Sequence, residues 1–213
     1  MPDIQALSHD FADYPNLRNQ LIIVTGRYIG MWCVVYAGAG REKKTEDFVR
    51  SVLPASVYSR CFHLVQHKAL KRQGVLRDVA GDYLPGYVFI ETDKPEKVYE
   101  ILKKTPGRLL FSDDWSVTVL AEKEESLLRL IVDAKGEIGI SVVRTFIEAE
   151  SGKKKSEYLS GPLEKVADQV VYVDFHHRFA EIGGEWIGSK KPPKLSFRFD
   201  GEEIKDVAYQ PGQ

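Results

Sequence analysis

Apolar positions alternate between strand-like and helix-like periods from residue 32 to residue 133. The segment Trp32–Tyr36 is aromatic and β-branched, which predicts a strand. Arg41–Leu53 places its apolar residues on one stripe with charges opposite, which predicts a helix that Pro54 ends. The same pattern predicts further strands at Cys61–Gln66, Tyr87–Ile90 and Trp115–Val119, and further helices starting at Pro95 and spanning Ala121–Asp133.

The strand Tyr87–Ile90 is predicted to lie inside the sheet. Its residues are apolar at odd and even positions alike, as in a strand that is covered on both faces. It follows Pro85-Gly86, where proline suits the first central position of a turn and glycine suits the second, which needs a positive φ. We therefore expect a tight turn directly before an interior strand.

The composition changes after residue 134. Residues 135–155 are polar and carry glycines, which predicts a linker, although Val142–Glu148 within them is compatible with a strand of either neighbouring domain. From Tyr158 onward the chain reads as all-β, with short strands at Val170–Val173, Phe179–Ile182 and Leu195–Phe199. The expected fold class is α+β: an N-terminal sheet flanked by helices at 31–134, a linker at 135–155, and a small all-β barrel at 156–208.

Residues 1–30 differ from the rest of the chain. The stretch 8–16 has neither a helical nor a strand period, and Met31 stands directly before the first convincing strand. We expect a dispensable N-terminal extension, disordered or due to a start assigned too early, because chain termini are poorly ordered unless they are tied down. An ordered arm that packs on the following domain is the alternative.

The composition is that of a globular protein, with 43% hydrophobic and 29% charged residues. The 30 basic and 31 acidic residues give a formal net charge of -1, which argues against a uniformly cationic nucleic-acid binder but allows local patches. The 2 cysteines cannot form a disulfide framework, which indicates a reducing compartment. No apolar run approaches the about 20 residues of a membrane span, and no signal peptide is evident, so we expect a cytoplasmic protein without membrane contact.

Residues suited to catalysis or metal binding are few. Cys61, His63 and His67 are evenly spaced, so a regular strand would point all three to one face, as a metal site requires. No fourth ligand is evident, however, and packing explains Cys61 equally well. His176 and His177 are adjacent, so on a strand they point to opposite faces. No phosphate-binding glycine loop is present. We therefore expect no enzyme, no cofactor and no metal site.

The stretch 62–77 contains no acidic residue. The basic residues Lys68, Lys71 and Arg72 lie within it, which predicts an extended hairpin or loop that reaches nucleic-acid phosphates. A solvated loop that is basic by chance is an equal alternative. The lysines at 153–155 are interpreted as part of a solvated linker.

Three aromatic residues lie on neighbouring predicted strands. Tyr87 and Phe89 share a face by the two-residue strand period, and Tyr36 ends the first strand. Either these rings fill a core beneath helices, or one face of the sheet is open and binds a partner. The pattern alone leaves both interpretations open.

A series of short motifs runs through the chain from residue 31: Met31-Trp32-Cys33-Val34-Val35-Tyr36, Gly40-Arg41-Glu42, Leu84-Pro85-Gly86-Tyr87-Val88-Phe89-Ile90, Thr105-Pro106-Gly107, Ser160-Gly161-Pro162-Leu163, Asp174, His176 and Arg178-Phe179-Ala180. In order and spacing, these motifs resemble the NusG family of transcription elongation factors. The C-terminal part resembles a KOW module and is similar to that of specialised LoaP-type antiterminators, although Lys165 and Asp168 stand where the KOW pattern usually has glycines.

The resemblance implies a factor that binds the clamp helices of bacterial RNA polymerase and suppresses pausing and termination. By position, the apolar depression that seats those helices would be lined by Tyr36, Leu84, Tyr87 and Phe89. The KOW domain would recruit a further partner, ribosomal or a termination factor. Basic residues would contact DNA or an RNA hairpin, namely Arg41, Lys44, Lys68, Lys71 and Arg72.

Two alternative functions are compatible with the same residues. One is a housekeeping elongation factor of the same family that couples the polymerase to a ribosome or a termination factor. The other is an RNA- or ribosome-binding module that makes no polymerase contact, since KOW barrels occur in ribosomal proteins.

Overall fold

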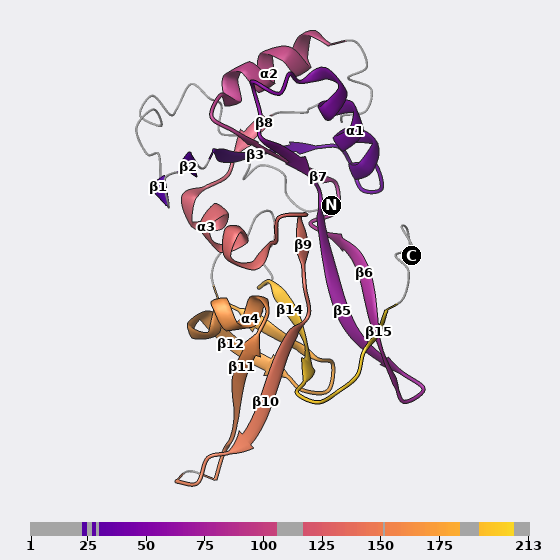
Figure 1. The fold of residues 1–213 in the computed structure, drawn as a ribbon, viewed down its shortest axis with the longest axis vertical. Helices are drawn as coiled ribbons and strands as arrows, with labels where there is room; N and C mark the ends of the chain where they lie inside the picture. The colour runs from indigo at the N-terminus through magenta and orange to yellow at the C-terminus, as the bar shows by residue number, and fades with distance from the viewer. Residues whose placement is uncertain are drawn as a thin grey trace. The chain divides into compact units, whose positions relative to one another are not determined.

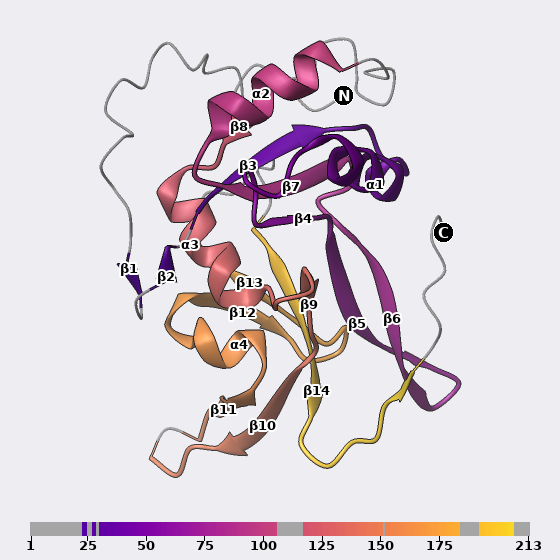
Figure 2. The same ribbon diagram turned by 45° about the horizontal axis from the view of Figure 1, so that its top comes forward.

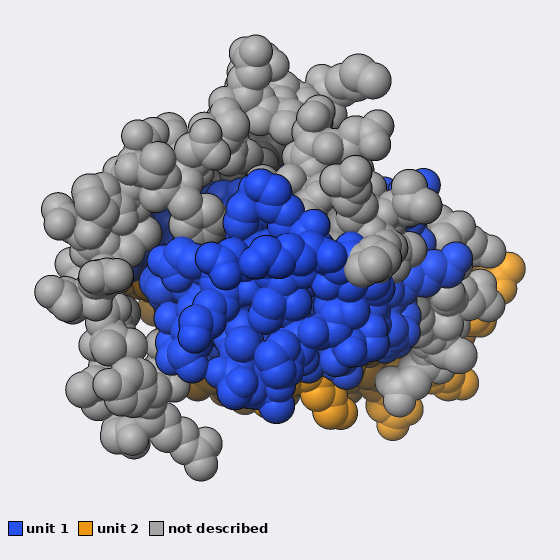
Figure 3. Space-filling model, turned by 90° about the horizontal axis from the view of Figure 1, so that it is seen from above, with its two compact units in different colours: residues 1–63, 84–125 blue, residues 64–83, 126–213 orange. Residues whose placement is uncertain are grey.

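The structure is a computed structural model that describes residues 23–24, 27–28, 30–105, 117–150, 152–183 and 192–206. The fold is mixed α+β, with helices and several sheets (Figure 1). The chain divides into two compact units, which Figure 3 colours separately. Unit 1 comprises residues 1–63 and 84–125, and unit 2 comprises residues 64–83 and 126–213.

Unit 1 is built on a four-stranded antiparallel sheet with the strand order β4-β7-β3-β8. The strand β7 is interior and its Val88, Phe89 and Ile90 have no exposed surface, as predicted for a strand covered on both faces. The elements are β3 (Met31–Tyr36), α1 (Glu42–Val52), β4 (Arg60–Phe62), β7 (Tyr87–Thr92), α2 (Pro95–Lys104) and β8 (Val117–Val119).

The two faces of this sheet carry different side chains. One face is aliphatic: Cys33, Val88 and Ile90 form a buried cluster with Val49 of α1 and Leu102 of α2, so these helices cover it. On the other face the alternate positions carry aromatic rings, at Trp32 and Tyr36 of β3, Phe62 of β4, and Tyr87 and Phe89 of β7. The two-residue strand period accounts for this separation.

Unit 2 contains a long β-hairpin within a four-stranded sheet of order β15-β6-β5-β9 (Figure 2). The strands β5 and β6 pair in register from Leu64↔Tyr83 to Arg72↔Val75. The turn between them uses Gln73 at φ 51° and Gly74 at φ 78°. Two positive φ values in a two-residue loop match the right-handed twist of a hairpin. The strands are β5 (Leu64–Arg72), β6 (Val75–Tyr83), β9 (Glu137–Ile138) and β15 (Lys205–Asp206).

A second sheet of unit 2 has five strands in the order β11-β10-β14-β13-β12. Its inner side chains, such as Val143, Leu195 and Phe197, are fully buried. A short helix leads from β11 towards β12, starting after Gly161 at φ 85° with Pro162 as its first residue. The elements are β10 (Ser141–Ile147), β11 (Lys154–Ser160), α4 (Pro162–Lys165), η5 (Ala167–Gln169), β12 (Val170–Asp174), β13 (Phe179–Ile182) and β14 (Lys194–Phe199).

Most predicted elements are confirmed. The helix α3 (Glu122–Ile131), which runs from the range of unit 1 into that of unit 2, falls within its predicted bounds, as does α1. The strands β12 to β14 match to one residue at an end, and the predicted start of α2 at Pro95 is confirmed. The basic stretch at 62–77 forms a hairpin rather than a loop. The segment predicted as a linker contains β9 and β10.

Two predictions are wrong. The strand predicted at Cys61–Gln66 is two strands, β4 and β5, which belong to different sheets and are separated at His63. The segment after Tyr158 is not purely β, because it includes α4 and η5. Neither Lys165 nor Asp168 has a positive φ, so the missing glycines of the KOW pattern create no backbone strain there.

The N-terminal prediction falls mostly outside the described residues. Within 1–30 the structure describes the paired strands β1 (Ile23–Val24) and β2 (Arg27–Tyr28), together with Gly30. In the described part of the chain, no helix has both the length and the apolar character needed to cross a membrane.

Candidate functional site

Two tyrosines at the end of the aromatic face of unit 1 are accessible. Tyr36 ends β3, Tyr87 begins β7, and the two residues are directly paired in the antiparallel register. Their rings lie 5.1 Å apart at 55°. Tyr36 is 38% exposed and Tyr87 is half-buried, and burial together with the neighbouring Tyr36 raises the pKa of Tyr87. With Leu84, these residues form what we call the Tyr36–Tyr87 surface.

A tight turn positions this surface. The Tyr87 N–H donates to the Leu84 carbonyl at 3.3 Å, with Pro85 and Gly86 as the central residues of the turn. Gly86 has φ 91°, and a Cβ there would lie 2.5 Å from the Tyr36 ring, so any other residue would displace that ring. Leu84 has φ 56°. A leucine in this left-handed region costs about 1–2 kcal/mol, and such strain tends to gather at binding sites.

A buried carboxylate ties this turn to the first helix. Glu42, the first residue of α1, is 4% exposed, and its Oε1 accepts the N–H of Gly86 at 2.6 Å and that of Gly40 at 3.0 Å. The Gly86 carbonyl in turn accepts the Ala37 N–H at 2.7 Å. One side chain therefore fixes both turns that flank the tyrosine pair. The sequence around Glu42 carries no pattern that indicates its contact with Gly86, so its role in holding this turn could not be predicted.

Phe89 does not line this surface, although its position had suggested that it would. It has 0% exposure and lies in the core between Phe62, stacked at 5.7 Å, and Trp32, edge-on at 6.0 Å. Phe89 belongs to the same sheet face as Tyr87, but the interior of that face is covered. Of the four residues predicted to line the depression, Tyr36 and Tyr87 are paired at the surface, Leu84 lies in the turn before Tyr87, and Phe89 is buried farther along the same sheet face.

The predicted basic residues of unit 2 lie on the β5–β6 hairpin. Lys68, Lys71 and Arg72 are all exposed, and cross-strand pairing adds the exposed Arg77 of β6. In this register Lys68, Arg72 and Arg77 share one face of the hairpin, whereas Lys71 lies on the other. Lys68, Arg72 and Arg77 make no ion pair with any residue in the described ranges. We call these four residues the cationic hairpin.

Two further predicted basic residues belong to unit 1. Arg41 directly precedes α1, Lys44 lies in its first turn, and both side chains are exposed. They share neither an element nor a unit with the cationic hairpin. Arg41 and Lys44 therefore form a basic group that belongs to unit 1, whereas the cationic hairpin belongs to unit 2.

The histidines suggested as metal ligands are paired with carboxylates instead. His63 Nδ1 lies 2.7 Å from Oε2 of the buried Glu46, and His67 Nδ1 lies 2.9 Å from Asp78. Burial raises the pKa of Glu46, but the His63 hydrogen bond and the charges of Arg50 and Lys43 lower it by more, so its net pKa lies below the ordinary value. Cys61 is buried, and this raises the pKa of its thiol to about 12. The described residues contain no group of three potential ligands arranged around a metal position.

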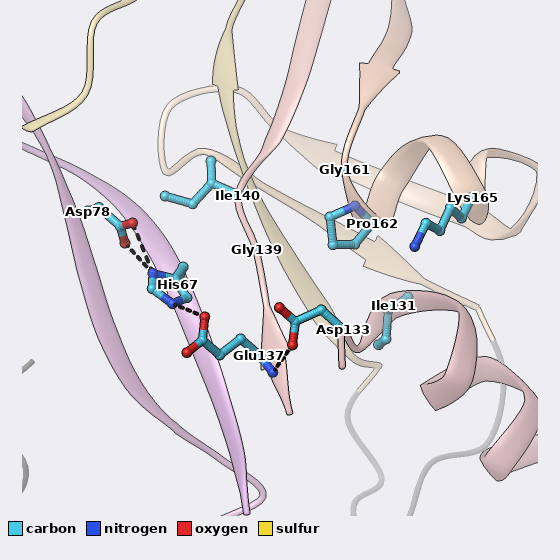
Figure 4. Close-up of a pocket in the computed structure, with 10 residues that line it drawn as sticks. All are labelled: His67, Asp78, Ile131, Asp133, Glu137, Gly139, Ile140, Gly161, Pro162 and Lys165. Carbon is cyan, nitrogen blue, oxygen red and sulfur yellow. Dashed lines mark hydrogen bonds and ion pairs between the residues drawn. The ribbon is translucent and has the colours of Figure 1, made fainter. Parts of the chain in front are cut away.

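A cavity of about 370 Å³ lies in unit 2 (Figure 4). His67 sits at its side between Asp78 and Glu137, whose Oε2 is 3.6 Å from His67 Nε2. The Asp133 carboxylate accepts hydrogen bonds from the backbone N–H groups of Lys135 and Glu137. The side chains of His67, Asp78, Glu137 and Asp133 are thus engaged with one another or with backbone N–H groups, and Lys165 also lines the cavity.

The sequence matches no protein-family model, and a search of curated proteins finds no match either. The features that bear on function are therefore the Tyr36–Tyr87 surface, the cationic hairpin and the motifs that resemble the NusG family.

Proposed function

We propose that this protein is a NusG-like transcription elongation factor that binds bacterial RNA polymerase through the Tyr36–Tyr87 surface and suppresses pausing and termination. Unit 1 would be the polymerase-binding domain, and the five-stranded sheet of unit 2 would correspond to the KOW barrel. The observation that carries the proposal is the exposure of Tyr36 next to Tyr87, on a turn held by Gly86 and Glu42.

The chemistry of this surface fits the clamp helices as a partner. Aromatic rings with a polar end are enriched at protein interfaces, because they bury a large area at low entropic cost and keep a hydroxyl for hydrogen bonding. Tyr36 and Tyr87 are paired across β3 and β7 next to the turn that Glu42 and Gly86 hold, so little ordering is needed when a partner binds. A pre-organised pair of rings is suited to an apolar helical hairpin.

The mechanism needs no bond-making step, and we propose no enzymatic activity and no cofactor. A factor that binds the elongating state of the polymerase better than the paused state shifts the equilibrium between them. A preference of about 1.4 kcal/mol changes that equilibrium about tenfold. The protein would act in the cytoplasm, and unit 2 would recruit a ribosomal or termination-factor partner.

We further propose that the cationic hairpin contacts DNA or an RNA hairpin near the bound polymerase. Lys68, Arg72 and Arg77 project from one face of a two-stranded ribbon and form no ion pair with the described side chains. A two-stranded ribbon fits the major groove of duplex DNA, and unpaired cations release counterions from phosphates. Arg41 and Lys44 would provide a second group of phosphate contacts.

A transcription assay tests the proposed activity. Single-round transcription with bacterial RNA polymerase across a pause and a terminator should give more read-through when the protein is added. Tyr36→Ala should abolish this gain, and Phe146→Ala, which truncates an exposed aromatic side chain of unit 2, should retain it. Equal read-through with and without the wild-type protein on several templates would contradict the proposal. RNA binding without any polymerase binding would favour the alternative of an RNA- or ribosome-binding module.

The contribution of the cationic hairpin has a separate test. Lys68→Gln combined with Arg72→Gln should weaken binding to a DNA duplex, and should lower the slope of log affinity against log salt by about 0.9 for each phosphate that the hairpin no longer binds. Lys155→Gln is the matched control, because Lys155 is an exposed lysine of the other long hairpin of unit 2. An unchanged slope in the double variant would show that the hairpin does not bind phosphates.

A further inference from the structure

A row of accessible rings lies on the outer face of the five-stranded sheet of unit 2. Tyr172 of β12 and Phe179 of β13 have ring centroids 6.3 Å apart, and Phe179 lies 6.4 Å from His177, which in turn lies 4.8 Å from His176. Tyr172 is 51% exposed, and 67% of the His177 side chain is exposed. We call these four residues the ring row.

The fold explains why these rings gather. Tyr172 and Asp174 alternate along β12, and Phe179 is paired directly with Asp174, so their side chains share one face. The alternate residues Ala180 and Ile182 are buried on the opposite face. His176 and His177 lie in the turn between β12 and β13 and not on a strand. The opposite orientations expected for adjacent residues of a strand therefore do not apply to them. That turn places both imidazoles at the end of the ring row.

One lysine and two carboxylates lie beside the ring row. Lys194 of β14 lies next to the row, with its Nζ 4.0 Å from the Phe179 ring and half of its side chain exposed. Two acidic residues share this face, but each is engaged. Asp174 accepts the backbone N–H groups of His176 and His177 and pairs with the His177 ring, and Glu181 pairs with Lys194 at 3.2 Å. Both carboxylates are mostly buried.

We propose that the ring row binds single-stranded nucleic acid by stacking bases on Tyr172, Phe179 and His177, with Lys194 next to the backbone phosphates. Accessible rings along a sheet face with a neighbouring cation are the arrangement with which proteins hold unpaired bases. A protein partner is favoured less, because the exposed groups of this face are rings and ring nitrogens rather than a continuous aliphatic floor. This inference makes no use of the polymerase contact, and it assigns unit 2 a ligand of its own.

The test is a titration of the purified full-length chain with fluorescently labelled oligoadenylate of about 12 nucleotides, as RNA and as DNA. Fluorescence anisotropy gives the affinity over a range of salt concentrations, since binding through the cationic hairpin weakens steeply with salt and stacking does not. Tyr172→Ala should weaken binding about tenfold, as expected for the loss of one stacked base. Tyr172→Phe should restore it, because the ring is retained.

Val171→Ala is the matched control. Val171 is 66% exposed and precedes Tyr172 on β12, but it makes none of the ring contacts, so its replacement should leave the affinity unchanged. His177→Ala serves as a second variant that changes only an exposed turn residue, and it should also weaken binding. Circular dichroism verifies that each variant is folded.

Several outcomes decide the proposal. Tighter binding of the RNA than of the DNA would identify RNA as the natural ligand, and equal binding would support the shared stacking chemistry. The proposal would be overturned if neither oligonucleotide bound, or if wild type, Tyr172→Ala and His177→Ala bound with equal affinity. Loss of a protein partner in Tyr172→Ala would not rescue it in either case. Because the assay contains no polymerase, its failure leaves the transcription proposal standing, and a failed transcription assay leaves this one standing.

Discussion

The aromatic face of the unit 1 sheet has two halves that look alike in sequence and differ in the structure. Trp32, Phe62 and Phe89 form the inner half and are at most 4% exposed. Tyr36 and Tyr87 form the outer half, where Tyr36 is 38% exposed. All five rings occupy alternate positions of β3, β4 and β7 on one side of the sheet. The difference arises at the strand ends, where β3 stops and the Leu84–Tyr87 turn begins.

This comparison separates stability from recognition. The inner half contributes to the free energy of unfolding through burial, and the outer half is available to a partner. The proposed role of a residue therefore depends on whether its ring is covered rather than on the ring itself. Four amino-acid substitutions test this contrast.

The largest expected effect is that of Phe89→Ala in the inner half. Removing a fully buried phenylalanine that contacts two other rings should lower the free energy of unfolding by about 3–5 kcal/mol. Denaturant unfolding followed by tryptophan fluorescence measures this. Phe146→Ala is the control, because Phe146 is 46% exposed and should change stability by less than about 0.5 kcal/mol. A loss at Phe89 as small as that at Phe146 would refute the division into two halves.

An intermediate effect is expected for Glu42→Ala, at the junction of α1 with the outer half. The change leaves the N–H groups of Gly40 and Gly86 without their acceptor, and it should cost about 1–3 kcal/mol. Unfolding measured as above gives the cost. The NMR signals of the Tyr36 and Tyr87 rings should also shift, because the turn that positions them is released. Unchanged ring signals in a destabilised variant would limit Glu42 to a structural role.

A smaller effect concerns the pH dependence of unit 1. The folded-state pKa of Glu46 is lowered, so its contribution to stability is complete above its unfolded-state pKa of about 4.5 and is lost as the pH falls through the folded-state value. Glu46→Gln should therefore lower the melting temperature at pH 7 and flatten its decline in acid. Melting curves from pH 7 to about pH 3 test this. Parallel curves for the two proteins would contradict the expected linkage.

Sequence predicted much of the fold but less of the site. The bounds of α1 and the starts of α2 and β7 followed from periodicity and from Pro54, Pro95 and Gly86, which act locally. The break at His63 was missed because β4 and β5 pair with strands of different sheets, which no local pattern shows. The apolar pattern predicted that β7 is covered on both faces, and only the family resemblance placed Phe89 in an open depression. A strand period identifies which face a ring occupies and not what covers that face. Contacts over long sequence separations, such as that of Glu42 with Gly86, leave no local pattern.

The same limit applies to the two long hairpins of unit 2. The lysine run at 153–155 stands out in sequence, yet Lys155 pairs with Glu148 across its hairpin. The basic residues at 68, 72 and 77 are dispersed in sequence, and cross-strand pairing collects them on one face. Spatial arrangement, rather than the density of charge along the chain, therefore distinguishes a candidate phosphate-binding surface.

The smallest effect on stability is expected for Tyr36→Ala, at less than about 1 kcal/mol, since much of this side chain is already in water. Its effect on polymerase binding should instead be large, and measuring that effect tests the proposed function most directly. The affinity of the purified chain for bacterial RNA polymerase, measured by biolayer interferometry, should fall at least about tenfold for Tyr36→Ala, because an aromatic hot spot contributes about 2 kcal/mol or more. An affinity equal to that of the wild type, in a variant that is fully folded, would contradict the claim that this surface seats the polymerase.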